Sequence, residues 1–159
     1  MLVRNMMTPR AETIGPGETL QAAASRMREL GVGSLVVREE EELLGILTDR
    51  DIVVRCVAQG FDPAQTEVRA AMTPQIIACH DGDGIEEAVA RMEEAAVRRV
   101  VVLDEAQHLV GMLSVDDVAL RSPMLAGEIV EHVLAPERPV RRGSYTWWEE
   151  ALAEGPRPT

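Results

Sequence analysis

The sequence lacks lysine entirely, has one Phe, one Tyr and two Trp, and has no uninterrupted apolar run of about 18 residues, the length that a membrane-spanning helix needs. Basic residues, all arginines, number 16 against 27 Asp and Glu, which gives a net charge of −11. Binding to nucleic acid through the phosphate backbone requires a basic surface that displaces counterions. The composition therefore argues against a membrane span and against a nucleic-acid partner.

Cysteine is also scarce, and both copies, Cys56 and Cys79, lie in apolar stretches. Free cysteine is among the most buried residue types, so we expect two structural thiols. A metal site at Cys79 and His80 is a weaker interpretation, because no further ligand stands at a recognised spacing. We predict no metal site and no catalytic residue, since the chain has neither a nucleophile–base pair nor a Walker-type glycine loop.

The first residues, MLVRNMMTPR, do not contain the apolar region and small-residue cleavage site of a secretory signal. We therefore expect a cytoplasmic protein.

The chain repeats itself once. VRNMMTPR at 3–10 aligns with VRAAMTPQ at 68–75, and GETLQAAASRMRELGV at 17–32 aligns with GDGIEEAVARMEEAAV at 82–97. GILTDRDI at 45–52 aligns with GMLSVDDV at 111–118. Self-similarity in this order indicates two copies of one structural unit. We assign repeat 1 to residues 1–62, repeat 2 to residues 63–122, and a C-terminal helix and tail to residues 123–159.

Hydrophobic periodicity predicts the same elements in each repeat. A half-strand, near 12–14 and again near 75–77, precedes a helix whose apolar residues recur at helical spacing. Two β-rich runs with a polar tip between them indicate a hairpin, and a short second helix follows. Each repeat is thus β-α-β-β-α, an α+β fold. Neither half buries much surface alone, so we expect them to pack sheet against sheet around a pseudo-two-fold axis.

The phrase that closes each repeat, Thr48-x-x-Asp51 and Ser114-x-x-Asp117, has two interpretations. A hydroxyl followed three residues later by an acid is close to a capping box, in which both side chains satisfy free backbone N–H groups. A carboxylate where a strand ends and a helix begins also suits ribose hydroxyls, as in dinucleotide-binding folds. Arg50 opposes the helix dipole. It either pairs with Asp49 or Glu41 or faces a ligand phosphate.

The duplicated unit, its M-T-P opening and its G-h-h-(T/S)-x-x-D-h ending (h, hydrophobic) together resemble the tandem cystathionine β-synthase (CBS) domain pair, or Bateman module, over residues 1–122. The resemblance implies two clefts that can hold AMP, ADP, ATP or S-adenosylmethionine, and modules that pair as homodimers. Carried over by position, the first cleft would use Thr13, Ile14, Thr48, Arg50 and Asp51. The second would use Ile77, Ala78, Ser114 and Asp117, with Arg98 and Arg99 contacting phosphate.

The two copies differ in charge. Arg50 aligns with Asp116, and Arg98–Arg99 aligns with Gly33–Ser34. We therefore hypothesise that one cleft dominates, the one built on Thr48 and Asp51. The predicted function is a regulatory, adenine-nucleotide-sensing module. The alternative is a structural or protein-interaction module with empty clefts, whose T/S-x-x-D motifs are helix caps only.

The sequence after repeat 2 has no counterpart in the repeats. Residues 123–134 follow a helical pattern after a proline, and such a helix would close the module or lie in a dimer interface. Three of the aromatic residues, Tyr145, Trp147 and Trp148, lie close together further on. They either pack on the domain or on a second copy, or form a docking element for a partner protein, because Trp and Tyr commonly anchor interfaces.

Overall fold

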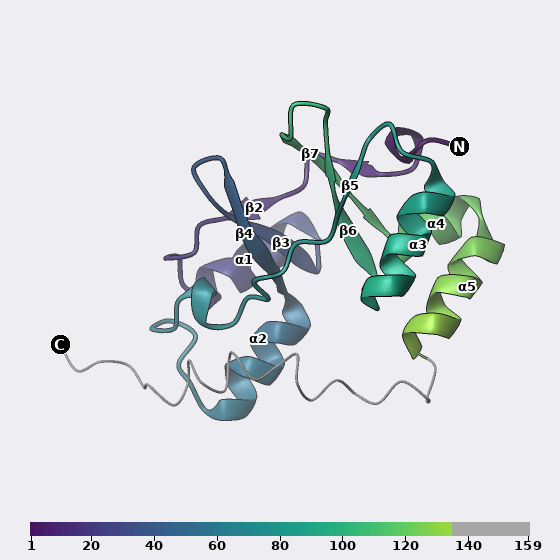
Figure 1. Cartoon of the computed structure of the whole chain (residues 1–159). Coiled ribbons are helices and arrows are strands. Elements are labelled where there is room, and N and C mark those ends of the chain that lie inside the picture. Colours follow the sequence, from purple (N-terminus) through teal and green to yellow (C-terminus); the bar gives the residue numbers. More distant parts are fainter. Residues whose placement is uncertain (135–159) are drawn as a thin grey trace. The chain divides into compact units, whose positions relative to one another are not determined.

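The computed structural model describes residues 1–134, which form two compact units (Figure 1). Residues 12–75 form one, called here the repeat-1 unit. Residues 1–11 together with the described residues from 76 onward form the other, the repeat-2 unit. The predicted aromatic cluster at Tyr145, Trp147 and Trp148 lies outside the described residues.

The repeat-1 unit contains a three-stranded sheet of order β2-β3-β4. Its elements in chain order are β2 (Thr13–Ile14), α1 (Leu20–Leu30), β3 (Ser34–Glu39), β4 (Glu42–Thr48), α2 (Asp49–Arg55) and the 3₁₀ turns η2 (Val57–Gln59) and η3 (Val68–Ala70). Strand β2 is parallel to β3, and β3 and β4 form the predicted hairpin. Thr19 caps the start of α1, and Gly31, at φ 67°, ends it in the left-handed conformation that glycine adopts freely.

The repeat-2 unit repeats this order with a four-stranded sheet, β1-β7-β6-β5. Its elements are η1 (Val3–Asn5), β1 (Thr8–Pro9), β5 (Ala78–His80), α3 (Ile85–Ala95), β6 (Arg99–Leu103), β7 (Leu109–Ser114), α4 (Val115–Arg121) and α5 (Pro123–Leu134). The predicted β-α-β-β-α order is confirmed in both repeats. The half-strand expected near 75–77 is wrong in position. It lies at Ala78–His80 because those residues, aligned with β2, pair with Val101 to Leu103.

The compact units do not coincide with the repeats of the sequence. The M-T-P segment of each repeat (residues 3–10 in repeat 1 and 68–75 in repeat 2) belongs to the compact unit formed mainly by the other repeat. The first segment joins the repeat-2 unit, where Val3 is fully buried and Thr8–Pro9 pairs with β7. The second stays with the repeat-1 unit, where Val68 is fully buried and Thr73 pairs with Ile46 of β4. The compact units therefore meet at 75/76, with residues 1–11 in the later unit, whereas the repeat boundary at 62/63 remains a prediction about the sequence repeats.

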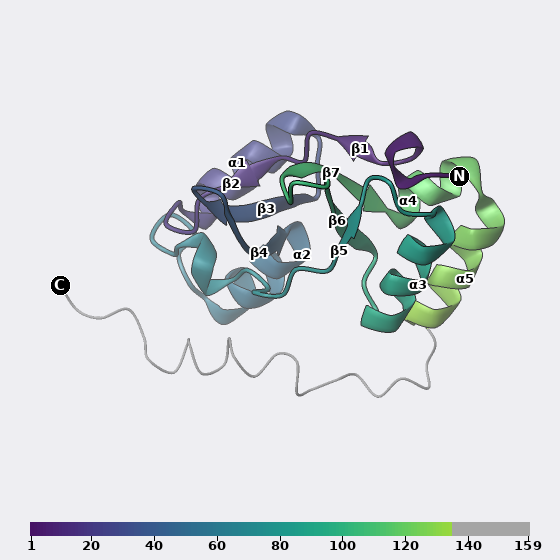
Figure 2. The ribbon, with the colours of Figure 1, turned by 45° about the horizontal axis from the view of Figure 1, so that its top comes forward.

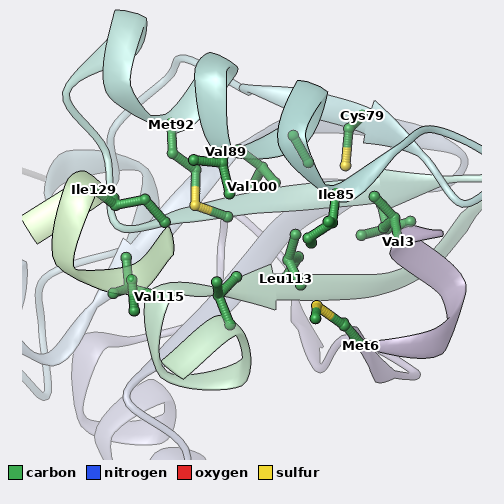
Figure 3. Close-up of a cluster of buried hydrophobic side chains, with 14 residues drawn as sticks. Val3, Met6, Cys79, Ile85, Val89, Met92, Val100, Leu113, Val115 and Ile129 are labelled. Atoms are coloured by element: carbon green, nitrogen blue, oxygen red, sulfur yellow. The ribbon is translucent and has the colours of Figure 1, made fainter. Parts of the chain in front are cut away.

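Each sheet buries one face under its own helices. In the repeat-2 unit, residues of η1, β5, β6, β7 and of helices α3, α4 and α5 share one apolar cluster (Figure 3). Helix α5, predicted at these residues, lies beside α3 and α4, and its Ala126 and Ile129 complete this cluster (Figures 1 and 2). Val36 and Val101 are fully buried but belong to neither core cluster, because alternation along a strand turns them to the opposite face. No helix within residues 1–134 has the length and apolar character to cross a membrane.

Gly45 and Gly111, three residues before each closing phrase, have a structural reason. A Cβ on Gly111 would lie 2.6 Å from the carbonyl oxygen of Thr8, and a Cβ on Gly45 would meet the carbonyl oxygen of Thr73 even more closely. Both positions face an M-T-P segment whose backbone lies directly against the strand. Only a residue without a side chain permits this approach.

We expect Gly45→Ala to lower the free energy of unfolding by about 2 kcal/mol, because the added methyl group overpacks the contact with the backbone of Thr73. Gly127→Ala is the control, since Gly127 lies in α5 with open space around its Cβ position. That change should stabilise the protein by up to about 1 kcal/mol through helix propensity. Urea denaturation of both variants measures the difference, and equal effects would contradict the steric explanation.

Candidate functional site

Both T/S-x-x-D phrases form complete capping boxes. Thr48 accepts a hydrogen bond from the backbone N–H of Asp51 at 3.1 Å, and Asp51 Oδ2 accepts from the backbone N–H of Thr48 at 2.8 Å and from its hydroxyl at 2.7 Å. Ser114 and Asp117 repeat all three bonds at the start of α4. The capping interpretation is confirmed in both copies. It leaves the ribose interpretation open, because it uses only one carboxylate oxygen.

The second oxygen of Asp51 is the counter-ion of a buried cation. Asp51 Oδ1 lies 3.3 Å from Nη2 of Arg55, one helical turn further along α2, and only 4% of the Arg55 side chain is exposed. Arg55 also donates to the carbonyl oxygen of Ala71 at 2.7 Å and to the Thr73 hydroxyl at 3.1 Å. This guanidinium therefore ties α2 to the second M-T-P segment through the carboxylate of the closing phrase.

The second oxygen of Asp117 has a neutral partner instead. Asp117 Oδ1 accepts a hydrogen bond from the hydroxyl of Thr8, the aligned threonine of the first M-T-P segment, at 3.0 Å. Arg121, which aligns with Arg55, donates to the backbone carbonyl of Asn5. The same phrase thus holds a carboxylate paired with a buried cation in the repeat-1 unit and a carboxylate bonded to a hydroxyl in the repeat-2 unit.

Strand register separates the predicted site residues of repeat 1 onto two faces. Thr13, Val36 and Ile46 are paired across the sheet, and Ser34 pairs with Thr48 two residues along, so these side chains share the face away from the core. This face, which also carries the capping hydroxyl, is called the outer face. Ile14 is 2% exposed and packs in the core cluster. Its side chain therefore points away from the outer face, because neighbouring residues of a strand point to opposite faces, and a place beside adenine stays a prediction for its backbone only.

In repeat 2 the outer face carries Ala78, Met112, Arg99 and Ser114, placed by the same register. Arg99 is half-buried and is paired directly with Ser114, which puts a cation beside the second closing phrase. Ile77 packs against the core cluster and does not join this group.

Arg98 precedes β6 as an exposed residue whose carbonyl oxygen accepts from the N–H of Val115. Arg50 is likewise exposed, and neither of its two expected partners binds its guanidinium. Asp49 accepts from the Arg50 backbone N–H, and Glu41 lies 3.8 Å from Arg38. Within residues 1–134, no ion pair includes Arg50.

The residues that sequence reasoning missed are Thr8, Thr73, Arg55 and Arg121. One local signal was present, because each closing aspartate is followed four residues later by an arginine, the spacing of an ion pair on a helix. That signal is identical in the two repeats, whereas the ion pair forms in repeat 1 and Arg121 binds Asn5 in repeat 2. The threonines could be found only with the positions of the M-T-P segments known.

Both thiols are buried, as predicted. Burial raises the pKa of Cys79 to about 11, with a further contribution from the Asp83 carboxylate, and burial also raises the pKa of Cys56. Both thiols therefore stay protonated at neutral pH, which makes them poor nucleophiles and metal ligands. In the part of the chain that the structure describes, no three His, Cys, Asp or Glu side chains gather as a possible metal site.

Comparison with known proteins agrees with this architecture. The family model described as "CBS domain" matches the chain twice, at residues 3–57 and 67–122. YhcV of Bacillus subtilis, a CBS domain-containing protein, is 36% identical over 118 residues, which cover 74% of this chain and 83% of that protein. Hypoxic response protein 1 of Mycobacterium tuberculosis is 38% identical over 133 residues, covering 83% and 91%.

Solved structures share the fold. A crystal structure of Hypoxic Response Protein I with two coordinated zinc ions matches with a TM-score of 0.66 at 35% identity, covering 76% of this chain and 98% of that one. A structure of CBSX2 in complex with AMP matches with a TM-score of 0.63 at 24% identity, covering 75% and 93%. The two family matches, the two β-α-β-β-α units and these relatives together show that the chain belongs to the CBS domain family, as a tandem pair.

Proposed function

We propose that this protein is a regulatory module that binds an adenosine-containing nucleotide on the outer face of the repeat-2 sheet, with Asp117 accepting from the ribose hydroxyls. The observation that carries this proposal is the hydrogen bond from Thr8 to Asp117. The capping box fixes the carboxylate through Oδ2, and Oδ1 is turned toward a neutral hydroxyl donor, the group that a ribose supplies. Nucleotide binding is also what the family resemblance implies, and CBSX2, of the same fold, was solved with AMP.

The hypothesis drawn from sequence favoured the copy with Thr48 and Asp51. The geometry favours the other copy, because Asp51 Oδ1 is already neutralised by a cation that is 4% exposed. A ribose hydroxyl would have to share that oxygen with a charged donor, whereas at Asp117 it competes only with a neutral one. Two acids in one first turn, Asp116 and Asp117, still repel phosphate, and Arg99 beside Ser114 offsets this charge.

Named roles follow for the remaining residues. Ala78, on the same outer face, would lie beside the base, and Arg98 with Arg99 would contact phosphate. In the repeat-1 unit, Thr13 occupies the place of Ala78, and Arg50 is a cation with no ion-pair partner within residues 1–134. We propose that a bound nucleotide changes the populations of two conformations, that a second copy or a partner protein reads the change, and that the protein acts without catalysing a reaction.

Titration calorimetry with AMP and ATP tests the site. Asp117→Asn preserves the cap, since asparagine accepts the same backbone bond, but presents an amide donor where the ribose donates. We expect it to weaken binding at least about 10-fold, the effect of losing a charged hydrogen bond. Asp116→Asn, which removes the same charge from the same turn, should leave binding unchanged or tighter. Equal losses in the two variants would contradict a clamp at Asp117.

A second function has one observation in its favour. Within residues 1–134, the Asp51 carboxylate contacts Thr48 through Oδ2 and the buried Arg55 through Oδ1, as expected of a helix cap and counter-ion only. If the second copy behaved alike, the protein would be an interaction module with empty clefts. Failure of AMP, ADP, ATP and S-adenosylmethionine alike to raise the melting temperature would favour this alternative, because a ligand at about 100 times its dissociation constant adds about 2.7 kcal/mol.

A further inference from the structure

We infer that Thr8 is a positioning residue. Its hydroxyl is bonded to the Asp117 carboxylate in the absence of ligand, and a ligand that replaces this hydroxyl loosens strand β1. The inference rests on the proposed function, because it concerns what the ribose displaces. Thr8 Oγ1 donates to Asp117 Oδ1 at 3.0 Å, and Thr8 is exposed. A hydroxyl at the surface can be exchanged for a hydroxyl of a ligand without burying or exposing a charge.

The repeat-1 unit supplies an internal comparison. Thr73, the aligned threonine, does not donate to the carboxylate of its own unit. It accepts from Arg55 at 3.1 Å, and Arg55 holds Asp51. This cation is almost fully buried and has further acceptors that hold it in place, so a ligand hydroxyl cannot replace it at Asp51 without removing a carboxylate from a buried charge. The exchange of one hydroxyl for another is therefore available in one copy only.

Strand β1 is short enough to respond to a single bond. It has two residues, paired as Thr8 with Met112 and Pro9 with Gly111, and the backbone N–H of Arg10 donates to Val110 just beyond it. Arg10 then takes a left-handed φ of 60°, which is unusual for a residue with a side chain. Segments held by few hydrogen bonds open locally at low cost. Loss of the Thr8 side-chain bond should therefore loosen the Arg10 amide.

Strand β1 lies just before the segment that connects the two units, so its loosening affects that segment. After Arg10 and Ala11 the chain leaves the repeat-2 unit, and Glu12 begins the repeat-1 unit. A ligand that displaces the Thr8 hydroxyl thus acts on the segment that connects the two units. Whether the Thr8–Asp117 bond is formed or broken is therefore what connects ligand binding at Asp117 to this segment.

Amide hydrogen exchange of the full chain, with and without AMP, tests the inference. In the wild type, AMP should speed exchange of the Arg10 amide. Thr8→Val, which keeps the shape but removes the hydroxyl, should show fast exchange at Arg10 without AMP and no further change with it. The same variant should bind AMP about 10-fold more tightly, since a hydrogen bond from a neutral hydroxyl to a charged carboxylate no longer has to be broken.

Two matched variants separate this role from a purely structural one. Thr8→Ser keeps the hydroxyl and should behave as the wild type, and Thr73→Val, at the aligned position, should leave both AMP affinity and Arg10 exchange unchanged. AMP binding to the wild type without any change at Arg10 would overturn the inference alone, as would weaker binding by Thr8→Val. Absence of AMP binding to the wild type would overturn the proposed function with it.

Discussion

Asp51→Asn is expected to lower the free energy of unfolding by about 3 kcal/mol, whereas Asp117→Asn, at the aligned position, should cost less than about 1 kcal/mol. Asparagine keeps the helix cap in both cases, so the difference isolates the second carboxylate oxygen. At Asp51 that oxygen neutralises Arg55, which is 4% exposed, and removing the carboxylate from a buried ion pair is strongly destabilising. At Asp117 the change leaves a neutral, exposed threonine hydroxyl. Urea denaturation of the two variants measures both values.

A double-mutant cycle identifies the cause. In an Arg55→Met background, Asp51→Asn should cost less than about 1 kcal/mol, because no buried cation remains to be neutralised. An undiminished loss in that background would refute the ion-pair explanation. The result also bears on ligand binding, since a substitution at Asp51 that weakens nucleotide binding would first have to be shown to leave the repeat-1 unit folded.

Removal of residues 1–10 is expected to unfold the repeat-2 unit while the repeat-1 unit persists, with a loss of at least about 4 kcal/mol in the stability of the former. Two buried side chains, Val3 and Met6, leave its core, and burial of such a side chain contributes about 1.5–3 kcal/mol. Strand β1 and the Thr8–Asp117 bond are lost as well. Hydrogen exchange should show the amides of β6 losing protection while those of β3 keep theirs.

Single substitutions at aligned, fully buried positions are the controls. Val3→Ala should reduce protection in β6, and Val68→Ala should reduce it in β3, each by about 2 kcal/mol, because each leaves a cavity in one core. If the truncated chain lost protection equally in β3 and β6, the first M-T-P segment would not belong to the repeat-2 unit in the way described.

The element order could be predicted from sequence because it depends on local patterns. Helical spacing of apolar residues, the hairpin tips and the duplicated phrase are all readable within about 15 residues of chain. The face on which each half-strand residue lies was readable too. A strand alternates, so the side chains of Thr13 and Ile14 point to opposite faces, and that of Ile14 belongs to the core.

The exchange of the M-T-P segments could not be predicted in this way. VRNMMTPR and VRAAMTPQ carry nearly the same apolar pattern, so either would fit against either sheet, and only the folded chain determines which one does. The different partners of Asp51 and Asp117 could not be predicted for the same reason. Arg55 and Arg121 stand at the same spacing, and their different contacts depend on tertiary neighbours that no local pattern encodes.

In connectivity the molecule is a circular permutant of a simple tandem array. Residues 12–75 form one contiguous block that ends with its own M-T-P segment, whereas the block from 76 onward has its M-T-P segment at the opposite end of the chain. A simple array would join its blocks once. This chain crosses between them twice, at 11/12 and at 75/76. Each crossing comes within about three residues after an M-T-P threonine, which is Thr8, bonded to Asp117, or Thr73, bonded to Arg55. The closing phrase of repeat 2 is thus bonded directly to the segment before one crossing, and the closing phrase of repeat 1 is bonded through Arg55 to the segment before the other.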